Sequence, residues 1–85
     1  MGHHVVYIDL FKGEPKREKK YYYTTKSEAL RDFNSFVDYY TRIGWREDYD
    51  FLQSYAAATG LFADTAIAFV SPDFEGYVVI AINPC

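Results

Sequence analysis

Hydrophobic residues alternate with polar ones near the start of the chain, recur every three to four positions in its middle and run almost continuously near its end. The opening segment HVVYIDLF, residues 4–11, is rich in β-branched and aromatic residues and predicts a strand. Its alternation places Val6, Ile8 and Leu10 on one face of that strand. A connection with turn-forming residues follows, and residues 18–25 predict a second strand that completes a hairpin.

The middle of the chain predicts a long amphipathic helix that starts at Thr25 and runs to about Ile43. Its apolar positions are Ala29, Leu30, Phe33, Phe36, Val37, Tyr40 and Ile43. Thr25 followed by Glu28 fits a capping box, in which the threonine hydroxyl accepts a helical amide and the glutamate reaches back to the cap. Gly44 suits the left-handed backbone that ends many helices.

A second, shorter helix is predicted over about residues 50–59. Asp50 and Gln53 form another possible capping pair, and the three alanines that follow favour helix. Gly60 is expected to end this helix.

The end of the chain predicts a second hairpin, with strands near residues 65–71 and 77–83 and with Pro72 and Asp73 at the corners of a β-turn. Both strands are apolar on both faces, whereas a sheet with one solvated face has a polar outer side. We therefore expect central strands whose outer face is covered by the chain's own segment 44–62, by a second copy or by another partner. The face expected to form a homodimer contact carries Tyr77, Val79 and Ala81.

This order of elements, β-β-α-α-β-β, predicts an α+β fold with a four-stranded, mostly antiparallel sheet and both helices packed on one face. A chain of 85 residues suits a single small domain, so residues 1–85 are expected to form one unit. Residues 1–4 are expected to be a flexible leader, since His3 and His4 after Met-Gly resemble an added tag.

The composition is that of an ordinary globular protein, with 49% hydrophobic and 25% charged residues. A single cysteine, Cys85, excludes a disulfide scaffold and favours a reducing compartment. No apolar run approaches the roughly 20 residues of a spanning helix, and no signal-peptide pattern opens the chain. These features predict a cytoplasmic protein.

The net charge of −3 conceals two blocks of opposite sign. Residues 12–31 hold seven basic and three acidic side chains, whereas the rest of the chain holds two basic and nine acidic ones. Such blocks can steer partners or pair with a second copy.

No catalytic, metal or cofactor site is predicted. The histidines His3 and His4 lie at the start of the chain, and no serine occupies a Gly-x-Ser-x-Gly elbow. Neighbouring histidines on a strand point to opposite faces, and the segment EDYD lacks the glycine and glutamate of a calcium loop. We therefore expect a protein that acts by binding and not by catalysis.

Protein binding is the favoured function, as a small adaptor or inhibitor of the kind found among phage and mobile-element proteins. The acidic half of the chain combines tryptophan, tyrosine and arginine, which are enriched at interface hot spots. The predicted contact residues are Tyr39, Arg42, Trp45, Glu47, Asp48, Tyr49 and Asp50. Trp45 equally suits an alternative role as a core residue after the first helix.

The alternative function is binding of single-stranded nucleic acid by the segment KREKKYYYTTK, residues 16–26. In such sites cations follow the backbone and aromatic rings stack under the bases. The candidate residues are Lys16, Arg17, Lys20, Tyr22 and Lys26. Edge strands also carry lysines simply to discourage pairing, and the acidic protein repels polyanions. We therefore expect a chiefly structural hairpin with Tyr21 and Tyr23 facing inward.

Overall fold

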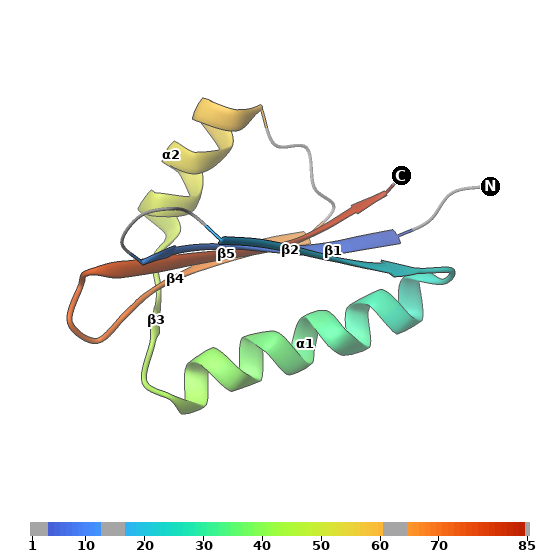
Figure 1. Ribbon diagram of the computed structural model, residues 1–85, viewed down its shortest axis with the longest axis horizontal. Coiled ribbons are helices and arrows are strands. Elements are labelled where there is room, and N and C mark those ends of the chain that lie inside the picture. The colour runs from blue at the N-terminus through green and yellow to red at the C-terminus, as the bar shows by residue number, and fades with distance from the viewer. Residues whose placement is uncertain (1–3, 13–16, 61–64, 85) are drawn as a thin grey trace.

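The computed structural model describes residues 4–12, 17–60 and 65–84. Its elements are β1 (His4–Lys12), β2 (Arg17–Tyr23), α1 (Lys26–Arg42), β3 (Arg46–Glu47), α2 (Tyr49–Thr59), β4 (Thr65–Val70) and β5 (Gly76–Pro84). The strands form one antiparallel sheet in the order β2-β1-β5-β4-β3. Figure 1 shows this sheet nearly edge-on. The predicted α+β fold and antiparallel sheet are confirmed.

The sheet has a fifth strand that the sequence did not predict. In the two-residue strand β3, Arg46 pairs with Val70 and Glu47 with Phe69. So short a strand shows no alternation in the sequence, and tertiary pairing alone defines it. His4 falls both in the predicted first strand and in the segment 1–4 expected to be flexible; it is the first residue of β1 and pairs with Tyr23 and Pro84.

The two helices cover opposite faces of the sheet (Figure 1), so the prediction that both lie on one face is wrong. On the face covered by α2, Phe51 stacks on Tyr77 with ring centroids 4.1 Å apart. The Tyr55 hydroxyl donates a hydrogen bond to the buried carboxylate of Asp9 in β1. The chain's own segment therefore covers the apolar outer face.

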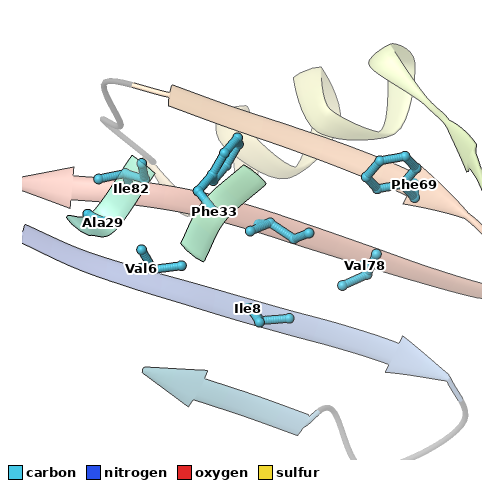
Figure 2. Close-up of a cluster of buried hydrophobic side chains, with 8 residues drawn as sticks. Val6, Ile8, Ala29, Phe33, Phe69, Val78 and Ile82 are labelled. Atoms are coloured by element: carbon cyan, nitrogen blue, oxygen red, sulfur yellow. The ribbon is translucent and has the colours of Figure 1, made fainter. Parts of the chain in front are cut away.

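The main core lies between α1 and the sheet (Figure 2). Its buried residues are Val6, Ile8, Ala29, Phe33, Phe69, Val78, Ile80 and Ile82. The helix contributes Ala29 and Phe33 from its predicted stripe, whereas Ile43 at the end of that stripe is exposed. The predicted face of β1 and the helical periodicity account for the core residues of β1 and α1, and the apolar strands β4 and β5 supply the rest.

Side-chain caps define where both helices begin. The Thr25 hydroxyl accepts the Glu28 amide at 3.2 Å and donates to the Glu28 carboxylate at 3.0 Å, which confirms the predicted capping pair. In α2 the cap is Asp48, which accepts the Phe51 amide at 3.0 Å, and not Asp50 as predicted. Gly60 ends α2 in the predicted left-handed conformation.

The turn between β4 and β5 presents an exposed aromatic ring. The Phe74 amide donates to the Ser71 carbonyl at 2.9 Å, which confirms Pro72 and Asp73 as the corner residues. Phe74 itself has a φ of 60°, unusual for a residue with a side chain, and 67% of it is exposed.

Candidate functional site

A cleft of about 500 Å³ opens between α1 and the β1–β2 hairpin. Its lining residues are Ile8, Leu10, Arg17, Lys19, Tyr21, Ser35, Phe36, Tyr39 and Tyr40. Strand β1 supplies two aliphatic side chains, α1 supplies three aromatic ones, and β2 supplies one ring and two cations. The cleft therefore combines an apolar interior with a positively charged side.

Strand register brings the β2 side chains of the cleft to one face. Tyr21 pairs with Val6, Lys19 with Ile8 and Arg17 with Leu10, and side chains of paired residues share a face. All three therefore lie on the face covered by α1. The helix meets them with Phe36, Tyr39 and Tyr40, which are neighbours on the helix surface at three- and four-residue spacing.

Two contacts hold α1 against one end of β2. The Tyr23 hydroxyl donates to the Asp32 carboxylate at 2.6 Å, and the rings of Tyr21 and Phe36 lie 5.6 Å apart. Burial, followed by this hydrogen bond to Asp32, raises the pKa of Tyr23 to about 12. Beyond Tyr21, long cationic side chains replace the rings along this face of the strand.

The cations of the cleft are available to a ligand. Within the described ranges 4–12, 17–60 and 65–84, no carboxylate forms an ion pair with Arg17 or Lys19. Burial, followed by the nearby Tyr39, raises the pKa of Tyr40 and so favours its neutral hydroxyl. The site can thus attract a negative group and bury apolar surface beside it.

Aromatic surface at the cleft is partly exposed. Tyr39 is 56% exposed and Tyr21 is 37% exposed, although both line the same cavity. Exposed tyrosines at the rim of an apolar cleft are suited to contact with a partner, because the ring is apolar and the hydroxyl is polar.

Of the predicted protein-binding residues, only Tyr39 lines this cleft. Arg42 pairs with Asp38 at 2.6 Å, and the Trp45 ring packs on Tyr40 at 5.0 Å beside the core. Asp48 caps α2. The exposed members of the set are Tyr39, Arg42, Glu47, Tyr49 and Asp50. Because the chain passes through β3 from α1 on one face to α2 on the other (Figure 1), these residues do not form one patch.

The predicted nucleic-acid residues are also separated. Arg17 lies on the face covered by α1, whereas the register places Lys20 and Tyr22 on the opposite face. Lys26 is the first residue of α1. Lys16 lies outside the described residues. The sheet therefore divides this set between two surfaces.

The predicted dimer face is covered within the single chain. Val79 and Ala81 are fully buried, and Tyr77 lies beneath the Phe51 ring of α2. These residues therefore do not form an exposed contact surface on the single chain.

The sequence did not identify Arg17 and Lys19 as two cations of one site. The available signal was the alternation of β2, which puts Arg17 and Lys19 on the same face as the inward-facing Tyr21.

Among the described residues, His, Cys, Asp and Glu form no group of three that could hold a metal ion. In the same described part of the chain, no helix is both long enough and apolar enough to cross a bilayer.

Comparison of this chain with family models, with curated proteins and with solved structures found no match.

Proposed function

We propose that the protein is a non-catalytic binding module that holds an extended segment of another protein in the cleft between α1 and the β1–β2 hairpin. The observation that supports this is the composition of the cleft: an apolar interior, partly exposed tyrosines and two cations without a described ion-pair partner. Binding sites are mostly apolar with a few polar groups that set orientation. Tyrosine and arginine are also frequent anchors at protein interfaces.

An adaptor or inhibitor role agrees with this site better than nucleic-acid binding does. A single strand of nucleic acid needs cations and stacking rings along one continuous track. Here Arg17 lies in the cleft, while Lys20 and Tyr22 lie across the sheet from it. A protein segment needs only one apolar side chain for the interior and a complementary charge for the rim.

Selection from a phage library of random peptides tests the proposal with the immobilised full chain as bait. Selected peptides should bind the wild type, and Tyr39→Ala should weaken binding at least tenfold, about 1.4 kcal/mol, because it removes an anchor ring at the rim. Tyr49→Ala is the matched control, since this tyrosine is 63% exposed on α2 and does not line the cleft. Failure to select any peptide, or equal binding to Tyr39→Ala and wild type, would contradict the proposal.

A further inference from the structure

We infer that the segment held in the cleft is acidic and adds to the free edge of β2 as a further strand of the sheet. This inference rests on the proposed function and names the class of its ligand. It follows from three properties of β2: its position in the sheet, its charge and its alternation.

Strand β2 lies at one edge of the sheet and pairs only with β1 among the described strands. Its residues 17–22 are all exposed. An edge strand presents unpaired backbone amides and carbonyls, and an extended peptide can satisfy them by lying alongside. The opposite edge is the two-residue strand β3, which offers far less backbone for pairing.

The charge of β2 favours an acidic partner over a second copy of this chain. The strand carries Arg17, Lys19 and Lys20 against one acid, Glu18. The Lys20 ammonium and the Glu18 carboxylate are 4.0 Å apart. Two β2 strands paired edge to edge would each carry three cations against one acid, so their net charges repel. A segment with carboxylates instead gains cross-strand attraction.

Alternation specifies where the side chains of the added strand would lie. Every second side chain would point to the face of α1, beside Arg17, Lys19 and Tyr21 at the mouth of the cleft. A carboxylate there lies next to the two cations. An apolar side chain two positions away can enter between Leu10 and Phe36, which line the interior. The ligand is therefore an extended segment that combines acidic and apolar residues.

The strongest peptide from the phage selection provides the probe, with binding followed by fluorescence anisotropy. We expect acidic residues to be enriched among the selected peptides. Methylation of single backbone nitrogens should weaken binding at least tenfold at every second residue and be tolerated between them, because only alternate amides of an added strand face β2. Raising the salt concentration should weaken binding as well, since exposed charge pairs are screened.

A charge-reversal pair supplies the matched control. The double variant Arg17→Glu and Lys19→Glu should lower the affinity for the peptide at least tenfold. Arg46→Glu should change its affinity less than twofold, because this exposed cation lies in β3 at the other edge of the sheet. Thermal melts of both variants establish that they fold.

The outcomes separate the inference from the proposed function. Two results would overturn the inference of an acidic added strand but leave the cleft as a binding site. The first is selection of Tyr39-dependent peptides that are neutral or basic. The second is selection of Tyr39-dependent peptides that tolerate methylation of every backbone nitrogen. The same holds if a single-stranded oligothymidylate displaces the peptide from the cleft cations Arg17 and Lys19. Absence of any Tyr39-dependent peptide overturns both proposals.

Discussion

Removing the ring of Phe51 tests whether α2 is a stable cover for the second face of the sheet. This half-buried ring stacks on Tyr77 at 4.1 Å and meets Phe11 edge-on at 5.7 Å. A fully buried Phe→Ala change costs about 3–5 kcal/mol. Since Phe51 is only half-buried, we expect Phe51→Ala to lower the free energy of unfolding by about 2 kcal/mol.

Urea denaturation followed by circular dichroism measures this loss. A chain of 85 residues has an unfolding free energy of about 4–13 kcal/mol, so the variant should remain folded. Tyr49→Ala is the control on the same helix, and we expect it to change stability by less than about 0.5 kcal/mol because this residue is largely exposed. A Phe51→Ala variant as stable as the control would refute the assigned packing of α2.

The same variant should self-associate. Val79 and Ala81 are fully buried on the face of the sheet that α2 covers, and loosening the helix should expose this apolar face. In sedimentation velocity at several concentrations, the wild type should remain a 9.9 kDa species while Phe51→Ala forms larger ones. Concentration-dependent growth of the wild type would show a contact other than this face.

Two further predictions concern stability. Tyr23→Phe should cost about 1–3 kcal/mol in a urea melt, since it removes the hydrogen bond to the Asp32 carboxylate, whereas Tyr22→Ala should cost less than about 0.5 kcal/mol. Because the pKa of Tyr23 is raised to about 12 from 10.0, its contribution is fully present below pH 10 and is lost as the pH rises to 12; Tyr23→Phe should flatten that part of a stability–pH profile. Phe74→Asn should raise stability by about 0.5–1 kcal/mol in thermal melts, because asparagine tolerates a positive φ better; a lower melting temperature would show that the exposed ring makes a stabilising contact.

The elements with strong periodicity could be predicted from the sequence. Helix α1 has both an apolar stripe and a local cap at Thr25, so two independent signals agree on it. The β4–β5 hairpin has apolar strands on either side of Pro72 and Asp73, whose turn chemistry is local. These features depend only on neighbours in the chain.

The arrangement of α2 could not be predicted in the same way. The apolar second face of β5 showed that something covers it, but the sequence left three candidates open. Which face a helix packs on depends on the path of the preceding connection, here the short strand β3. The cap also shifted from Asp50 to Asp48, since either aspartate can accept a helical amide and tertiary position selects one.

The cleft is a second feature that could not be predicted from the sequence. Its residues come from β1, β2 and α1, and no short motif links Leu10, Arg17 and Tyr39. The space between them depends on how closely α1 approaches β2, which the contacts of Tyr21 and Tyr23 set. Tyr39 was found because exposed tyrosines are frequent at interfaces, whereas the paired cations required the strand register.

The two adjacent lysines of β2 provide the sharpest distinction between the binding modes. Lys19 lines the cleft, and alternation places Lys20 on the opposite face with Tyr22. Lys19→Glu and Lys20→Glu change the net charge equally, so long-range attraction of an acidic ligand is altered to a similar extent in both. Fluorescence anisotropy with the selected peptide should show at least a tenfold loss of affinity for Lys19→Glu and a much smaller one for Lys20→Glu.

Single-stranded oligonucleotides give the opposite expectation if nucleic acid is the ligand. A site on the outer face would use Lys20 and Tyr22, with affinity that falls steeply as salt rises. If both lysine variants lower the affinity for the peptide equally, then the overall charge, and not the cleft, governs binding. A selective loss at Lys19 requires a ligand on the α1 face, because only there does the strand register bring a β2 cation beside the aromatic residues of the helix.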